Sequence, residues 1–216
     1  MLASEIMRPD PITVSPDTTL PDAIRLMDRH RIRHLPVVEH GELVGIVSDR
    51  DLKHAMASRA TSLEIHELRY LLDRVQMRDI MSGGVVTIRP SMPVEEAARL
   101  MAQEKIGALP VTVDGALVGI VTETDVLTLF VEAMGVGEPS SRLDVCLGDR
   151  PAALAEVARL LADSGVTISS IMTLRRGGSR QAVVRVATID PRPAIRALAR
   201  GGYAVREGER PPIGKS

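Results

Sequence analysis

Two short motifs carry the hydroxyl and carboxylate side chains that are best placed for chemistry in this chain. Ser48-x-x-Asp51 and Thr122-x-x-Asp125 each set a hydroxyl three residues before a carboxylate, and 74 residues separate the two motifs. Ser or Thr followed at this spacing by an acid is typical of a helix cap. A capping hydroxyl also lies where the first turn of a helix attracts an anion.

The same spacing relates much longer stretches of the chain. Glu5-Ile6-Met7 returns as Asp79-Ile80-Met81, and Ile32–Val37 returns as Ile106–Val111 with Leu-Pro-Val kept. Leu43–Val47 is repeated unchanged as Leu117–Val121. Each copy is too small to bury a core alone, so we expect the two copies to pack together.

Each copy is predicted to form β-α-β-β-α. Pro21 and Pro93 lie near the first turn of the first helix, where a missing N–H is tolerated. The second helix is predicted to begin at Asp49 or Glu123. The predicted strands are residues 12–14, 35–38 and 44–48 in the first copy and 86–88, 109–113 and 117–122 in the second.

The repeat stops near residue 135, and a different pattern follows. Residues 141–208 read as β-α-β-β-α-β, the ferredoxin-like order. Between the copies, Thr61-x-x-Glu64 predicts a capped helix. The fold class is therefore α/β (α+β). The predicted segments are repeat 1 (1–57), a linking helix (58–76), repeat 2 (77–134), a linker (135–140), a second domain (141–208) and a flexible tail (209–216).

Composition excludes several classes of protein. The net charge is −1, with 27 basic and 28 acidic residues, which argues against a protein that holds nucleic acid by bulk charge. Only two Tyr and one Phe are present, so base-stacking platforms are not expected. The single cysteine, Cys146, fits a reducing compartment. We see no secretory signal and no membrane span, and we expect a cytoplasmic protein.

Metal binding and catalysis find little support in the residues. The five histidines (His30, His34, His40, His54 and His66) fit no standard ligand spacing. No P-loop, nucleophile elbow or dinucleotide fingerprint is present. We therefore expect no catalytic residue, no structural metal and no required cofactor.

The repeat resembles the CBS domain, and two copies in tandem resemble a Bateman module. The Leu-Pro-Val segments, the Gly-x-Leu-Val-Gly-Ile-Val strands and the two Ser/Thr-x-x-Asp motifs carry this resemblance. It implies an adenosine-containing ligand, such as AMP, ADP or ATP, in clefts between the repeats. Asp51 and Asp125 would accept ribose hydroxyls, and Ser48 and Thr122 would contact a phosphate. The other implied binding residues are Thr13, Arg33, His34, Pro36, Arg50, Thr87, Ala108, Pro110 and Thr124.

The two copies differ where a phosphate chain would lie. The first carries Arg31, Arg33 and Arg50, whereas the second has Lys105, Gly107 and Thr124 at the same places. Guanidinium groups suit phosphates. We therefore predict that the site of the first repeat takes ADP or ATP rather than AMP.

The second domain resembles an ACT domain through Asp149–Leu154, Leu161 and Gly165–Ile168. That family usually has Gly where this chain has Ala152, and a methyl group there would crowd an amino-acid ligand. Dimerisation is the role we expect instead. A CBS pair followed by an ACT domain is similar to the AcuB-like (acetoin-utilisation protein) family.

These resemblances together imply a regulatory protein without enzymatic activity. It would be a homodimer that senses an adenine nucleotide and relays this to the ACT domain or to an unknown regulated protein. A dimeric scaffold with vestigial pockets is the alternative. An enzyme acting on a nucleotide is a third reading.

Overall fold

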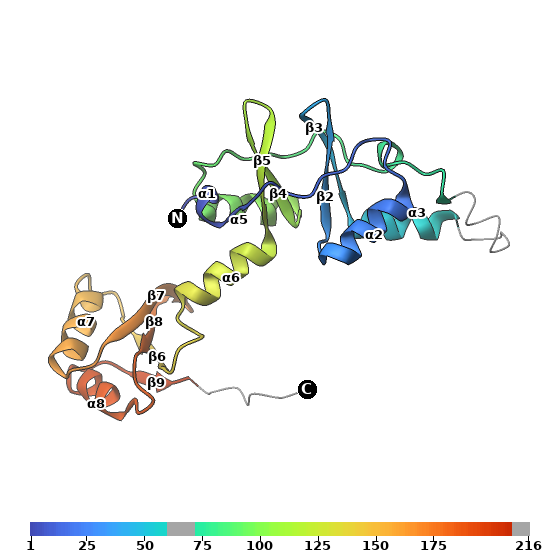
Figure 1. The fold of residues 1–216 in the computed structure, drawn as a ribbon. Coiled ribbons are helices and arrows are strands. Elements are labelled where there is room, and N and C mark those ends of the chain that lie inside the picture. The colour runs from blue at the N-terminus through green and yellow to red at the C-terminus, as the bar shows by residue number, and fades with distance from the viewer. Residues whose placement is uncertain (60–71, 209–216) are drawn as a thin grey trace. The chain divides into compact units, whose positions relative to one another are not determined.

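The computed structural model describes residues 1–59 and 72–208 of the chain. It divides into two compact units, residues 1–126 and 127–216 (Figure 1). The predicted linking helix with its Thr61-x-x-Glu64 box lies largely outside the described residues, as does the tail after residue 208. Each unit is considered by itself below.

Two β-hairpins, each followed by a helix, dominate the first unit. The helices at Asp49 and Glu123 begin where the sequence predicts. In chain order the elements are α1 (Ala3–Ile6), β1 (Arg8–Pro9), α2 (Leu20–His30), β2 (His34–Glu39), β3 (Glu42–Ser48), α3 (Asp49–Arg59), the 3-10 turn η1 (Met77–Asp79), α5 (Val94–Glu104), β4 (Ala108–Val113), β5 (Ala116–Thr122) and α6 (Glu123–Ala133), whose residues from Leu127 onward belong to the second unit.

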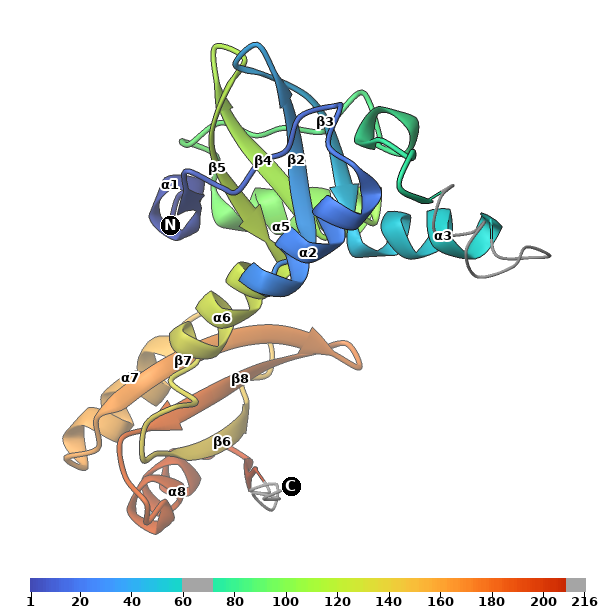
Figure 2. The same cartoon turned by 45° about the vertical axis from the view of Figure 1, so that its right-hand side comes forward.

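The two hairpins have the same internal register. Leu35 pairs with Val47 in β2–β3, and the equivalent Leu109 pairs with Val121 in β4–β5. The hairpins lie side by side (Figure 2), and their strands meet where Glu42 pairs with Ala116. The sheet is antiparallel, its strand order is β1-β5-β3-β2, and β4 pairs with β5. The sequence repeat is thus a structural repeat.

The predicted strands at residues 12–14 and 86–88 do not form, and this prediction was wrong. Each segment makes only an isolated bridge, Val14 with Val37 and Ile88 with Val111. Pro16 and Pro90 follow these segments and offer no N–H to extend a ladder. Each segment is therefore joined to its hairpin by one bridge and does not become a strand of the sheet.

The start of each copy packs against the other copy. Ala3 is fully buried in the core of the second repeat, with Ile88, Leu109 and Val121. β1 pairs with β5, where Arg8 lies opposite Ile120. In the same way, Met77 is buried in the core of the first repeat, and Ser82 bridges to Ile46. The two repeats therefore depend on each other for a complete core.

The second unit has the predicted β-α-β-β-α-β order. Its elements are β6 (Ser141–Cys146), α7 (Ala153–Asp163), β7 (Ile168–Arg176), β8 (Ser179–Val186), α8 (Arg192–Arg200) and β9 (Val205–Glu207). The strands are antiparallel in the order β7-β8-β6-β9. α7 and α8 cover one face of the sheet (Figure 1). Val157, Leu161 and Leu198 are buried in one core with Leu143.

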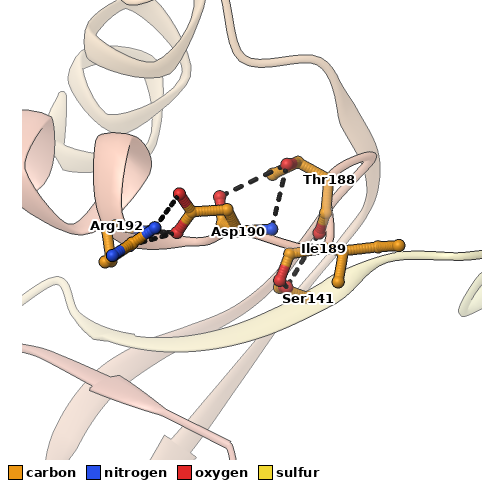
Figure 3. A network of polar contacts seen from close by, with 5 residues as sticks. All are labelled: Ser141, Thr188, Ile189, Asp190 and Arg192. Atoms are coloured by element: carbon orange, nitrogen blue, oxygen red, sulfur yellow. Dashed lines mark hydrogen bonds and ion pairs between the residues drawn. The ribbon is translucent and has the colours of Figure 1, made fainter.

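A polar network holds the loop before α8 against β6 (Figure 3). The buried Ser141 hydroxyl donates to the carbonyl of Thr188 at 2.7 Å. Asp190 accepts hydrogen bonds from the backbone N–H of Arg192 at 3.1 Å and from its guanidinium at 2.7 Å. These bonds lower the pKa of Asp190 to about 2. The carboxylate of Asp190 thus stabilises the first residues of α8.

Candidate ligand-binding clefts

The Ser/Thr-x-x-Asp motifs cap α3 and α6 in the same way. The Ser48 N–H and hydroxyl donate to Asp51 Oδ2 at 2.8 Å and 2.6 Å. The Thr122 N–H and hydroxyl donate to Asp125 Oδ2 at the same two distances, 2.8 Å and 2.6 Å. The capping interpretation of the motifs is confirmed.

The second carboxylate oxygen distinguishes the two motifs. Asp125 Oδ1 lies 3.5 Å from Arg8 Nε. Within the described part of the chain, Asp51 Oδ1 has no hydrogen-bond or ion-pair partner. An acceptor-only carboxylate oxygen in this state is free to accept a ligand hydroxyl. Of the two carboxylates, Asp51 is therefore the one better able to accept a hydrogen bond from a ligand.

Residues of these motifs line two clefts in the first unit: Thr122 lines one, and Ser48 and Asp51 line the other. The Thr122 cleft, of about 330 Å³, is lined by Arg8, Pro9, Asp10, Pro11, Ile12, His30, Arg31, Ile32, Arg33, His34, Ile120, Thr122 and Thr124. The Ser48 cleft, of about 410 Å³, is lined by Arg33, His34, Ile46, Ser48, Asp49, Arg50, Asp51, Ser82, Gly83, Gly84, Val85, Val86, Lys105, Ile106, Gly107, Ala108 and Glu123. Both volumes lie in the range of small-molecule sites.

Each cleft is assembled from both repeats. Residues 8–12 of the first repeat line the Thr122 cleft, and the equivalent residues 82–86 of the second line the Ser48 cleft. A motif from one repeat thus faces the leading segment of the other. This arrangement arises because each leading segment packs against the hairpin of the other repeat: β1 pairs with β5, and Ser82 bridges to Ile46.

Most of the predicted binding residues line one of the clefts. Ser48, Arg50, Asp51 and Ala108 line the Ser48 cleft. Thr122 and Thr124 line the Thr122 cleft, and Asp125 lies beside it through its contact with Arg8. Arg33 and His34 line both.

Four predicted residues lie elsewhere. Thr13 is exposed and lines neither cleft, because its neighbour Ile12 takes the inward position. Thr87 lines a separate hollow beside the β4–β5 turn. Pro36 and Pro110 are buried, and their carbonyls accept the N–H groups of Val14 at 3.1 Å and Ile88 at 3.0 Å.

The arginines predicted to gather at the first motif are divided instead. Arg31 lines the Thr122 cleft, Arg50 lines the Ser48 cleft, and only Arg33 reaches both. The sequence comparison assigned Arg31 to the same site as Arg50, whereas in the structure these two residues line different clefts. The structure adds Arg8, Ile12, Lys105 and Val86 as lining residues, which no local sequence signal identifies.

His34 lies in the wall between the two clefts. A Cβ atom placed on Gly107 would be 3.2 Å from its ring, so a larger residue at position 107 would press on the imidazole. Burial, together with the positive charge of Arg33, lowers the pKa of His34, while Asp49, Glu123 and Asp51 raise it in part. The protonated form of the imidazole is thus disfavoured.

Within residues 1–59 and 72–208, no group of three His, Cys, Asp or Glu side chains is arranged to hold a metal ion. Over the same ranges, no helix is long and apolar enough to cross a membrane.

Known proteins resemble the first unit. The CBS-domain family matches residues 3–58 and 77–132. The solved structure of the CBS domain pair of protein MJ0100, in complex with 5′-methylthioadenosine and S-adenosyl-L-methionine, is 30% identical with a TM-score of 0.53, over 61% of this chain and 97% of that one.

Two other solved structures are similar over the same part of the chain. A putative acetoin utilization protein (AcuB) from Vibrio cholerae is 32% identical with a TM-score of 0.54, over 63% of this chain and 95% of that one. CBSX2 in complex with AMP is 31% identical with a TM-score of 0.50, over 61% and 96%. Since the family match covers both repeats and just over half of the sequence, the chain belongs to the CBS-domain family as a tandem pair.

Proposed function

We propose that this chain is a regulatory protein, without enzymatic activity, that binds an adenosine-containing ligand such as AMP, ADP or ATP in its paired clefts. Ligand binding would be relayed to the second unit or to a regulated partner protein. The observation that carries the proposal is the pairing, in the Ser48 cleft, of the helix-capping hydroxyl of Ser48 with the carboxylate of Asp51 three residues later.

The residues of the Ser48 cleft suit the parts of such a ligand. Asp51 Oδ1 is available to a ribose hydroxyl. Ser48 lies at the start of the 11-residue helix α3, where the helix dipole favours a phosphate. Ile46 and Val86 offer aliphatic surface for the base. The complexes of similar CBS pairs with 5′-methylthioadenosine and with AMP support an adenosyl ligand.

The second unit is proposed to be an ACT domain that serves dimerisation rather than amino-acid binding. Its strand order and its β-α-β-β-α-β sequence of elements agree with that assignment. Ala152 has φ −85 and ψ −1, a right-handed conformation, so the backbone there does not require glycine. A methyl group is therefore accommodated where it would obstruct an amino-acid ligand.

A binding panel tests the proposed ligand class. AMP, ADP, ATP, NAD, 5′-methylthioadenosine and S-adenosylmethionine would each be added while thermal unfolding is followed. A ligand at 100 times its dissociation constant stabilises the fold by about 2.7 kcal/mol. If no compound raises the melting temperature, the protein is better described as a scaffold with vestigial pockets.

The variant Asp51→Asn examines the ribose contact. Its amide oxygen can keep the cap at Ser48, while its NH₂ group replaces the accepting Oδ1. We expect adenosine affinity to fall about tenfold, with the melting temperature of the free protein unchanged. Asp114→Asn, on the β4–β5 turn, is the matched control. Equal affinity in the two variants, measured by calorimetric titration, would remove Asp51 from the site.

A further inference from the structure

The wall between the two clefts contains a single guanidinium. Arg33 and His34 are the residues that line both clefts. The equivalent residues of the second repeat, Gly107 and Ala108, line only the Ser48 cleft and carry no charge. The internal symmetry of the pair is therefore broken at the place where the clefts meet.

Arg33 connects the two helices whose N-termini border the clefts. Its backbone carbonyl accepts the N–H of Asp49, the first residue of α3, at 2.9 Å. Its Nη2 donates a long hydrogen bond of 3.5 Å to the hydroxyl of Thr124, in the first turn of α6. The main chain of Arg33 is thus held at the Ser48 cleft while its side chain reaches the Thr122 cleft.

The guanidinium of Arg33 is available to an anion. The side chain is exposed, and in the described part of the chain no carboxylate lies within ion-pair distance of it. Its neighbour in the wall, His34, faces Asp49, Asp51 and Glu123. Arg33 is therefore the permanently charged side chain that lines both clefts.

We propose that the two clefts compete for Arg33, so that a phosphorylated nucleotide in one cleft weakens the binding of a second phosphorylated nucleotide in the other. This inference rests on the proposed function. A guanidinium binds one phosphate through two parallel hydrogen bonds and cannot offer the same geometry to a second.

The competition selects the pair of ligands that the protein holds together. An adenosyl compound without phosphate, such as 5′-methylthioadenosine, does not need Arg33. One phosphorylated and one unphosphorylated ligand are therefore the favoured combination, and two nucleotides are disfavoured.

Cleft-blocking variants measure this coupling. Ile12 lines only the Thr122 cleft, and the equivalent Val86 lines only the Ser48 cleft. Ile12→Trp and Val86→Trp should each leave one cleft open, which gives the AMP association constant of each cleft alone. For independent clefts, the product of the two constants equals the overall constant of the wild type for two AMP molecules.

We expect the wild-type overall constant for AMP to be about tenfold below that product, which corresponds to about 1.4 kcal/mol of unfavourable coupling. Adenosine should show no such deficit. In an Arg33→Ala background the deficit for AMP should vanish. Arg50→Ala, which removes a cation that lines only the Ser48 cleft, should keep it.

Equality of product and overall constant for AMP overturns the coupling but leaves the proposed function standing, whereas absence of binding by any adenosyl compound overturns both. A deficit that persists in Arg33→Ala assigns the coupling to other residues and also overturns the inference. If a tryptophan variant unfolds, the ratio of the first to the second AMP constant replaces the product. That ratio should fall in Arg33→Ala and stay unchanged for adenosine.

Discussion

His34 makes the stability of the first unit depend on pH. Its pKa in the folded protein is lowered, first by burial and then by Arg33, below the 6.5 of an unperturbed histidine. The unfolded chain therefore takes up a proton at a higher pH than the folded protein does. The contribution of His34 to the free energy of unfolding is therefore present above the unfolded-state pKa of about 6.5. It is lost as the pH falls toward the lower pKa of the folded protein.

The variant His34→Ala isolates this contribution, since alanine is the residue at the equivalent position 108. We expect the wild type to lose more unfolding free energy than His34→Ala between pH 7.5 and pH 5.5 in urea titrations. Parallel losses in the two proteins would show that His34 does not titrate in this way.

Individual residues were predictable when their role was local. The caps at Ser48 and Thr122 follow from spacing alone, since both partners lie within one turn. The cleft to which Arg31 belongs did not follow, because alignment of the repeats shows which residues are equivalent and not which cleft they face. That information resides in the crossed packing of residues 1–9, which is a long-range contact.

Among the elements, strand β1 is positioned by a glycine on β5. A Cβ atom on Gly119 would lie 2.6 Å from Met7 Sδ and 3.1 Å from the backbone carbonyl oxygen of Arg8. At the equivalent Gly45, the three atoms nearest to an added Cβ all belong to the side chain of Met81, with Sδ at 2.5 Å. A flexible methionine can move aside, whereas the carbonyl of a paired strand cannot move without shifting β1.

We therefore expect Gly119→Ala to destabilise the protein by about 1–3 kcal/mol, as overpacking typically does. Gly45→Ala should cost less. Urea unfolding of both variants compares the two costs. The displacement of β1 should also separate Arg8 from Asp125 at the Thr122 cleft. A larger loss for Gly45→Ala would contradict the argument.

The predicted elements agree with the structure where hydrophobic pattern and turn signals coincide. The two hairpins and the helices that follow them lie within one or two residues of the prediction. Residues 12–14 and 86–88 have the composition of strands, but each offers only one bridge to β2 or β4. Composition does not reveal whether a neighbouring strand has room for a ladder.

For the whole molecule, the exposed side of α6 bears on assembly. Leu127, Phe130 and Val131 are 62%, 52% and 46% exposed, and α6 has no buried residue. Phe130 is the only phenylalanine of the chain. Apolar side chains gathered on one helix favour a protein partner. We propose that a second copy of this chain covers them, in agreement with the homodimer expected from the sequence.

Phe130→Asp should therefore shift the protein toward monomers, because a carboxylate in an apolar interface would be left without a partner. Sedimentation or light scattering at several concentrations measures this shift. Val113→Asp is the matched control, since Val113 is 45% exposed on a different element, β4. It introduces the same charge and should leave the dimer intact. A wild type that is monomeric at all concentrations would overturn the homodimer and leave α6 for a different protein. A Phe130→Asp variant that remains dimeric would assign the dimer interface to another surface.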